Sequence, residues 1–331
     1  SFNMQSWYAL SDIDAIGTVR QAGRMLLLEH PPSPLRWHDR QRAVIRAAIH
    51  DAKLASTAEA VLSAVTIADK SGIGHDLWRQ LQHYGINHLL VISGLHVALV
   101  SALAFWLGRL LGAGLGAISS RASRFPWAEV SAFSLALAYT GLAGFSVATQ
   151  RALVMLACYL LSRVLLRTSS GFNNLLVAAF VLSVINPLVF LGAGFWLSFG
   201  AVAVLLWSGR WQGRGGLAKV LRPQLAIALA MLPLGAFWFG GSSWVSPLAN
   251  LLMIPLLGFF VIPLSLVGAF LVLIGADGAA AACWQLAALP LDVLWPLIVL
   301  IDRHAPLYWQ TSAGIGSMLL VLAGCLLCMV P

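Results

Sequence analysis

The sequence predicts an all-α membrane protein, a polytopic bundle of about 8–10 transmembrane segments with broken or re-entrant helices. Of its 331 residues, 60% are hydrophobic and only 10% are charged, whereas a soluble domain carries about 25% charged residues. From residue 86 onward, apolar runs recur at lengths of about 20 residues, enough to cross a hydrocarbon core as a helix. Prolines and asparagines interrupt some of these runs.

The apolar runs define nine approximate spans: 86–108, 127–145, 147–166, 173–190, 193–209, 222–240, 246–274, 279–300 and 313–330. The seventh is too long for one simple crossing and contains Pro247, Asn250 and Pro255. We expect a broken helix or a re-entrant hairpin there. Such breaks occur at membrane depth only where protein or water shields the freed backbone groups.

Two segments precede the transmembrane domain, which we expect to be residues 81–331. Residues 1–30 show short β-like runs typical of the tail of a soluble, OB-like β domain. Residues 31–80 begin as a proline-rich linker and continue as amphipathic interfacial helices, whose arginines could meet phosphates of lipid or of nucleic acid. The sequence opens in mid-pattern, so we expect it to be part of a longer protein.

Positive charge is concentrated in the apolar part of the chain. Residues 86–331 hold eleven Lys and Arg but only four Asp and Glu. Both the positive-inside bias of membrane proteins and an electrostatic path for a polyanion explain this excess. Basic residues follow alternate spans, around 109–124, 163–167 and 210–222. These loops therefore share one side, which we expect to be the cytoplasm, and residues 1–85 lie outside it.

The most informative stretch contains polar residues in an apolar setting. His88, Ser93 and His96 lie in or just before the first span. They cannot all face lipid, because an unpaired polar group there costs several kcal/mol. Gly94 permits close approach of another backbone. Capping and packing of helices or the lining of a polar path explain these residues equally well on chemistry alone.

This stretch, HYGINHLLVISGLHVALV, resembles the core motif of the ComEC-type competence family. Three further motifs follow in the expected order. GFSVATQRA at 144–152 resembles the family's Arg-Ala turn, with Thr149 where proline is often found. Asn186-Pro187 with GFWLSF at 194–199, and then SPLANLLMIPL at 246–256, resemble its remaining signatures. The resemblance covers residues 70 to 265, most of the membrane part.

The resemblance implies an inner-membrane channel that passes single-stranded DNA into the cytoplasm during natural transformation. The conduit candidates are His88, Ser93, Gly94, His96 and Arg151. An arginine near the centre of a span costs about 2.5–3.5 kcal/mol. Arg151 is therefore expected to face phosphate in a water-lined position, with snorkelling to the membrane edge or a carbonyl partner within its helix as the alternatives.

A second group of residues is expected to shape helix breaks rather than to contact a ligand: Asn186, Pro187, Ser198, Pro247, Asn250 and Pro255. The implied partners are single-stranded DNA, membrane lipid, a DNA-receptor protein outside and an ATP-driven translocase on the cytoplasmic side. Assembly into a homo-oligomer is left open.

Two other functions remain open. An intramembrane serine hydrolase would use Ser93 as nucleophile and a histidine as base, since Ser93 and His96 share a helix face, but no acid is present to orient either histidine. A secondary transporter of a small solute would normally show an inverted repeat, and none is convincing.

No enzyme activity, cofactor or metal site is expected in this chain. Many full-length members of the family carry a metallo-β-lactamase-like domain, which needs a dense cluster of histidine and aspartate ligands. The eight histidines form no such cluster.

Overall fold

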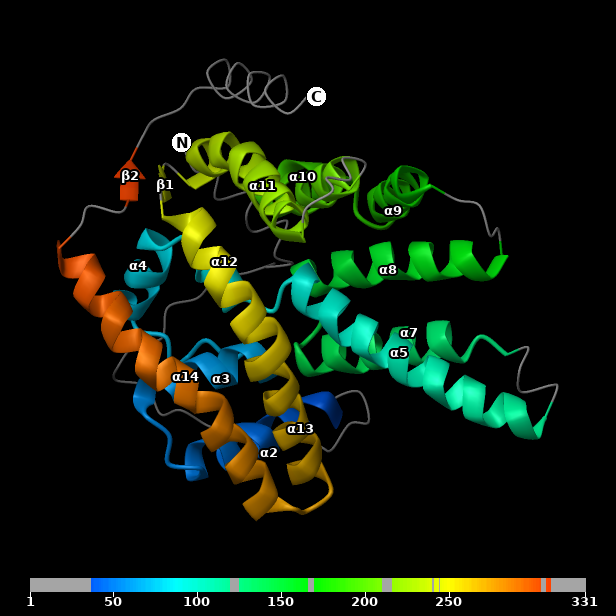
Figure 1. Ribbon diagram of the computed structural model, residues 1–331, viewed down its shortest axis with the longest axis horizontal. Coiled ribbons are helices and arrows are strands. Elements are labelled where there is room, and N and C mark those ends of the chain that lie inside the picture. Colours follow the sequence, from blue (N-terminus) through cyan, green and yellow to red (C-terminus); the bar gives the residue numbers. More distant parts are fainter. Residues whose placement is uncertain are drawn as a thin grey trace, which may run out of the picture.

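The computed structural model describes residues 37–119, 125–165, 170–209, 216–239, 241–243, 245–304 and 308–310, and these are almost entirely helical (Figure 1). Four helical segments are long and apolar enough to cross a membrane: Gly94–Ile118, Val147–Leu165, Ser246–Leu273 and Asp277–Leu300. The prediction of a helical membrane protein is thereby confirmed. The total of 8–10 crossings stays a prediction. The expected span 313–330 and the expected β segment 1–30 lie outside the described residues.

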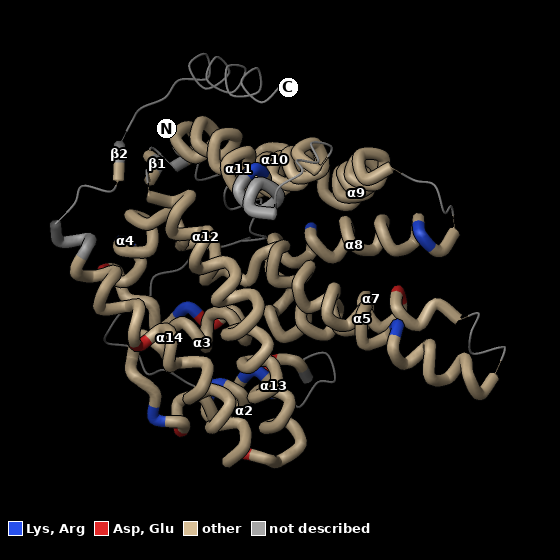
Figure 2. The backbone as a smooth tube through the Cα atoms, in the orientation of Figure 1, with Lys and Arg blue, Asp and Glu red and all other residues tan. Residues whose placement is uncertain are grey.

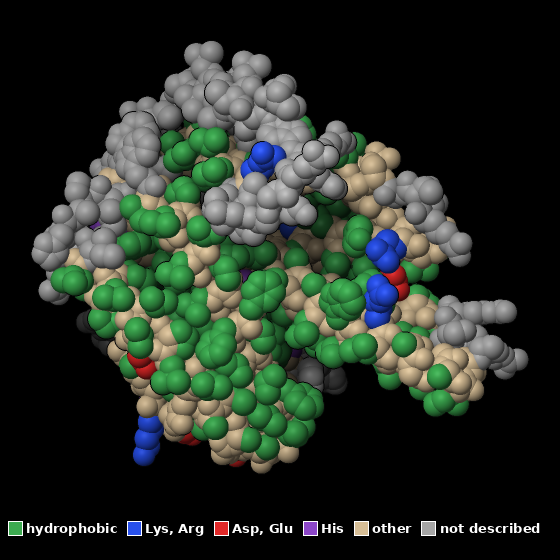
Figure 3. Space-filling model, viewed as in Figure 1, with side chains coloured by type: hydrophobic (Ala, Val, Ile, Leu, Met, Phe, Trp, Pro, Cys, Tyr) green, Lys and Arg blue, Asp and Glu red, His purple; other side chains and the backbone are tan. Residues whose placement is uncertain are grey.

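Large apolar side chains cover the outside of the molecule. On α9 (Gly171–Ile185), Leu176, Phe180 and Val184 are exposed by 68%, 68% and 67%. Figure 3 shows apolar side chains over much of one face, with few charges among them. Patches of this extent are costly in water but are the expected exterior in lipid, since helices satisfy their own backbone groups.

Five helices from α5 to α10 form an up-and-down arrangement: α5 (Gly94–Ile118), α7 (Trp127–Leu142), α8 (Val147–Leu165), α9 and α10 (Ala193–Ser208). The α5–α7 pair packs closely because Gly108 leaves room for the α7 backbone, and Ser131 Oγ lies 2.8 Å from the Ala104 carbonyl oxygen. Gly94 lies against Ala152, and Arg163 lies over the ring of Phe105. Helices α5 and α8 therefore run parallel.

Charged side chains are sparse on this bundle (Figure 2). At the far end of α8, Arg163 Nε lies 3.3 Å from a carboxylate oxygen of Glu129 in the first turn of α7. Arg109 belongs to the same end of α5 and lies over the Trp106 ring. The first turns of α5, α8 and α10 thus share the opposite end of the bundle.

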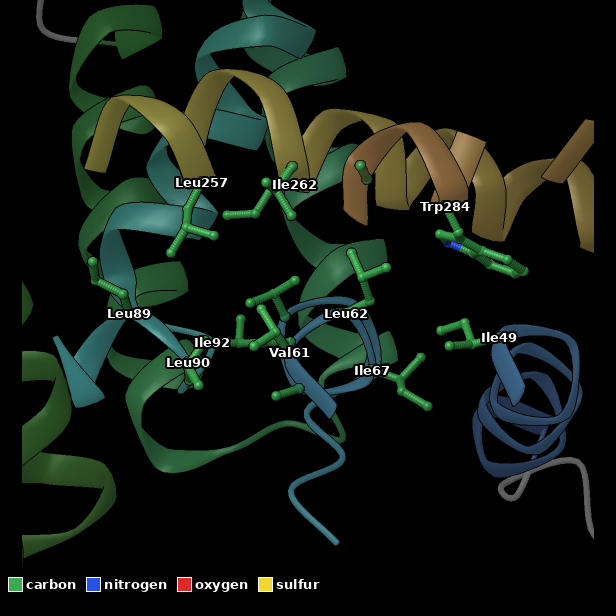
Figure 4. Close-up of a cluster of buried hydrophobic side chains, with 14 of the residues drawn as sticks. Ile49, Val61, Leu62, Ile67, Leu89, Leu90, Ile92, Leu257, Ile262 and Trp284 are labelled. Atoms are coloured by element: carbon green, nitrogen blue, oxygen red, sulfur yellow. The ribbon is translucent and has the colours of Figure 1, made fainter. Parts of the chain in front are cut away.

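A short apolar helix lies at the centre of the fold. Helix α2 (Trp37–Asp51) is amphipathic, and α3 (Ser56–Ile67) follows it. Nine of the twelve residues of α3 are buried. Its Val61, Leu62 and Ile67 pack with Leu257 and Ile262 of the later helices (Figure 4). Helix α3 therefore lies in the core of the fold, and both the domain boundaries and the interfacial helices expected from sequence remain predictions.

The second half of the chain contributes α11 (Gly216–Phe239), α12 (Ser246–Leu256), α13 (Ile262–Leu273) and α14 (Asp277–His304). A π-helical turn, η4 (Leu257–Val261), joins α12 to α13 without reversing the chain. Of the two alternatives expected at 246–274, the re-entrant hairpin is therefore wrong, and the structure has a helix interrupted by a π-helical turn. The prolines produce an irregular turn, because each removes one backbone donor from the helix.

Short elements complete the described chain. Helix α4 (His75–His83) and the 3₁₀ turn η2 (Asn87–Leu89) precede α5, so the first long span begins at Gly94 rather than at residue 86. A second 3₁₀ turn, η3 (Pro187–Leu191), links α9 to α10. Strands β1 (Gly241–Ser243) and β2 (Tyr308–Gln310) pair antiparallel, with Gly241 opposite Gln310.

Candidate functional site

The first motif forms the start of α5. Ser93 is the N-cap residue, and its backbone N–H donates to Nδ1 of His96 at 3.3 Å. His96 is 1% exposed. The Ser93 side chain faces the His96 backbone N–H in a capping box at this helix start, but among the described residues no hydrogen bond of normal geometry satisfies its buried oxygen. His88 precedes this turn on η2 and is exposed, unlike His96, but the two imidazole groups are close enough to interact electrostatically.

The second motif forms the start of α8. A tight turn at Gly144 and Phe145, both with positive φ, brings the chain into the helix, and Thr149 Oγ1 donates to the Ser146 carbonyl oxygen at 2.8 Å. One turn later, Ala152 faces α5: a methyl group added at Gly94 would lie 3.4 Å from its Cβ. The first and second motifs are therefore in contact (Figure 1).

The third motif meets the second through Arg151. A Cβ added at Gly194 would lie 2.7 Å from Nη2 and 3.2 Å from Cζ of Arg151. The guanidinium group therefore occupies the space that a side chain on α10 would need. Within α10, Ser198 Oγ donates to the Gly194 carbonyl oxygen at 2.7 Å, so this hydroxyl is satisfied by its own helix.

The Asn-Pro pair builds the turn before α10. Asn186 caps η3, with its Oδ1 accepting from the Leu188 N–H at 3.0 Å, and Pro187 occupies the first position of the turn. Proline fits there because its missing N–H is one that would have no partner. Both residues therefore shape the connection between α9 and α10.

The fourth motif packs against the beginning of the first. Gly85 has φ +65°, and a Cβ there would lie 2.6 Å from Oγ of Ser246. Asn250 Nδ2 donates to Ser246 Oγ at 3.1 Å, while its Oδ1 is buried without a partner among the described residues. The Pro247 carbonyl oxygen accepts from Gln224 at 3.4 Å. Pro255 is exposed near the end of α12.

Buried polar atoms without a hydrogen-bond partner concentrate at these motifs. The described part of the chain contains five such side-chain atoms, and three belong to the motifs: Ser93 Oγ, Arg151 Nε and Asn250 Oδ1. Each lies in the first two turns of its helix or at its N-cap. An unsatisfied buried group in a native structure indicates a functional role or a bound water or ion. Ser93 and Arg151 thus form a polar layer at the end of the bundle where α5, α8 and α10 begin, whereas Asn250 belongs to α12.

Sequence reasoning named most of this layer but missed the glycines that assemble it. Gly85 and Gly194 provide the close contacts to Ser246 and Arg151, yet neither was a candidate. Their signal was present, since each lies inside a motif that also carries polar residues.

The competence protein family matches residues 65–331, which include all four motif segments. The chain belongs to the competence protein family. The ComEC-type resemblance seen in the sequence is thereby confirmed.

Curated members of the family are longer than this chain. Competence protein ComA of Neisseria gonorrhoeae is 31% identical over 99% of this chain and 46% of its own length. Recombination protein 2 of Haemophilus influenzae is 29% identical over 86% of the chain and 36% of its own length. ComE operon protein 3 of Bacillus subtilis is 27% identical over 66% and 27%. The chain thus spans less than half the length of these relatives, and no solved structure matches it.

The residues that match the competence family, 65–331, include all four helical segments that could cross a membrane. Among the described residues, no group of three His, Cys, Asp or Glu side chains could hold a metal ion. The acceptor role of His96 Nδ1 toward a backbone N–H also leaves that nitrogen unavailable as a base for the Ser93 hydroxyl.

Proposed function

We propose that this chain forms the inner-membrane passage for single-stranded DNA during natural transformation. The family and the printed names of two relatives, a competence protein and a recombination protein, agree with such a role. The observation that carries the proposal is that buried polar atoms without a hydrogen-bond partner, Ser93 Oγ, Arg151 Nε and Asn250 Oδ1, recur in the motifs. In a passage, water and the moving strand would satisfy these atoms.

Arg151 supplies the strongest physical argument. Its guanidinium group has no acidic partner or hydrogen bond among the described residues, and its Nε is buried. Arg151 is half-buried, and removing part of a charged group from water without an opposite charge nearby is unfavourable. A polyanion that passes the site would supply the missing countercharge, at whichever nucleotide is present, so the interaction does not depend on base sequence.

The direction of passage follows from the placement of the two ends. The polar layer lies at the end opposite to Arg109 and Arg163, whose side the positive-inside rule assigns to the cytoplasm. DNA would thus enter at the motif end, where an outer receptor would deliver it. It would leave at the basic end, where a cytoplasmic ATP-driven translocase would pull it.

The proposal is tested by a transformation assay that scores internalised DNA separately from surface-bound DNA. A clean deletion should abolish internalisation and spare surface binding. Arg151→Gln should reduce internalisation while membrane levels of the protein stay normal. Arg79→Gln is the matched control, because its guanidinium already pairs with Asp76 at 3.0 Å and is exposed. Normal internalisation in the deletion strain would refute the proposal.

A serine hydrolase is the second candidate, and the geometry disfavours it. The Ser93 hydroxyl has no base within hydrogen-bond distance among the described residues, although a nucleophile requires one. Labelling of Ser93 by a serine-reactive probe would revive the hydrolase. Accumulation of a small solute by reconstituted vesicles would instead favour a secondary transporter.

A further inference from the structure

We infer that Arg151, seated on Gly194 between the first turns of α5 and α10, forms a subsite for one phosphodiester group of the strand. This inference rests on the proposed function and assigns the contact that holds the backbone of the strand. Gly194 acts as a positioning residue, because it has no side chain and so leaves the space against α10 that the Arg151 guanidinium occupies.

The contact between Gly194 and Arg151 is so close that any side chain at position 194 would have to move the guanidinium group. A Cβ at Gly194 would lie 2.7 Å from Nη2 and 3.2 Å from both Cζ and Nη1. Non-bonded carbon contacts are normally about 3.5–4.0 Å. An alanine there would therefore displace the guanidinium group, although the site would keep its charge.

Arg151 differs from the other half-buried arginine in the described part of the chain. Arg42 donates from Nε and Nη2 to the Ile67 carbonyl oxygen at 3.2 and 3.0 Å and lies 3.6 Å from Asp39. Arg151 has no such partner among the described residues, and its Nε is a buried donor without an acceptor. A guanidinium group can donate two parallel hydrogen bonds to phosphate oxygens. A phosphodiester would therefore supply the acceptors that Arg151 lacks, whereas Arg42 already has acceptors within the protein.

The neighbouring helix starts add to the attraction for an anion. Gly94 is the first residue of α5 and Gly194 is the second of α10, and they lie against the adjacent residues Ala152 and Arg151 of α8. The first N–H groups of a helix have no acceptor within the helix, and its N-terminus carries about half a positive charge. The start of α10 therefore lies directly beside the guanidinium, and the start of α5 lies against the next residue of α8. The unpartnered Ser93 hydroxyl at the N-cap of α5 offers a further donor.

The test is binding of a short single-stranded oligonucleotide to the full chain in lipid nanodiscs, measured at several salt concentrations. Gly194→Ala and Arg151→Gln should each weaken binding about tenfold. Loss of one phosphate contact should also lower the slope of log affinity against log salt concentration by about 0.7. The double variant should bind no more weakly than either single variant, because both changes remove the same contact.

Gly200→Ala is the matched control on the same helix. Its Cβ would meet Met231 Cε at 3.5 Å, an ordinary contact. It should bind like the unchanged protein. Arg151→Lys, which keeps the charge, should retain the salt slope and lose part of the affinity, and it provides the test if Gly194→Ala fails to fold. An oligonucleotide with a neutral methylphosphonate backbone should bind equally to all the variants.

Unchanged affinity and salt slope in both Gly194→Ala and Arg151→Gln would overturn the subsite while leaving the DNA passage standing. An equal loss in Gly200→Ala would assign the effect to packing and would also overturn it. Failure of the proposed function looks different, since the unchanged protein would then bind no oligonucleotide and its deletion would leave internalisation intact.

Discussion

The phenolic hydroxyl of Tyr139 donates a hydrogen bond to the Val65 carbonyl oxygen at 2.8 Å, and both residues are buried. Val65 lies in the last turn of α3, whose final carbonyl groups have no donor within the helix. Arg42 reaches the neighbouring Ile67 carbonyl oxygen from α2. Two other helices thus complete a helix end that would otherwise leave unsatisfied acceptors inside the core.

Tyr139→Phe should lower the free energy of unfolding by about 1–3 kcal/mol, because it leaves the buried Val65 carbonyl oxygen without a donor. Unfolding of the purified protein in detergent measures the change. Tyr159→Phe provides the control, since that hydroxyl accepts only a 3.4 Å bond from Arg163 at the surface. Equal effects of the two substitutions would contradict a special role for Tyr139.

Hydropathy predicted the helical membrane class because it depends on local composition, but it could not place α3. Residues 31–80 were expected to be a linker followed by amphipathic interfacial helices. The structure ends α2 at Asp51, where Lys53 takes a positive φ, and buries α3 among helices of the distant second half. Burial on all sides depends on partners remote in sequence, which a local pattern does not contain.

The candidate site, too, could be predicted only in part from local sequence patterns. Polar residues in apolar spans identified Ser93, His96, Arg151 and Asn250 as unusual. Their meeting depends on Gly85 and Gly194, which fit Ser246 and Arg151 across more than forty residues of sequence in either case. From the prolines at 247–263 the sequence predicted a broken helix or a re-entrant hairpin, because the local pattern cannot distinguish a hairpin from a π-helical turn that absorbs the missing donors.

Asp69 provides a prediction about acid stability. Burial acts to raise the pKa of its carboxyl group, but hydrogen bonds from Ser71 and the Arg46 guanidinium at 2.6 Å outweigh burial and hold the pKa below its ordinary value of 3.8. A lowered pKa in the folded state contributes stability above the unfolded pKa, and this stability is lost as the pH falls through the folded value.

Asp69→Asn should therefore be less stable than the unchanged protein at pH 7, and the difference should shrink as the pH falls below about 4. Thermal unfolding from pH 7 to pH 3 measures it. Asp76→Asn, which removes the exposed pair with Arg79, should have little effect at pH 7. A stability difference for Asp69→Asn that stays constant down to pH 3 would contradict the lowered pKa.

The α5–α7 contact gives a prediction with a control on the same helix. A Cβ at Gly108 would lie 2.5 Å from the Trp127 carbonyl oxygen and 2.9 Å from the Ala128 Cα, and backbone atoms cannot rotate away. Gly108→Ala should destabilise the protein by about 1–3 kcal/mol through overpacking. Gly114→Ala has nothing within 4 Å and should be neutral or stabilising by up to about 1 kcal/mol. Unfolding of both variants distinguishes packing from helix propensity, and equal stabilities would contradict the close contact.

Gly85 lies before α5 and contacts Ser246 at the start of α12, so its replacement would cause both backbone strain and a clash. Replacement of Gly275 would cause backbone strain alone and serves as the comparison. Gly275 has φ +82° and open space, so Gly275→Ala should cost only the backbone strain, about 1–2 kcal/mol. Gly85→Ala adds a clash with Ser246 at 2.6 Å and should cost more. Because the clash separates the first motif from the fourth, Gly85→Ala should also reduce DNA internalisation relative to Gly275→Ala at matched membrane levels. Equal internalisation by the two variants would show that passage does not depend on this contact, since backbone strain is common to both.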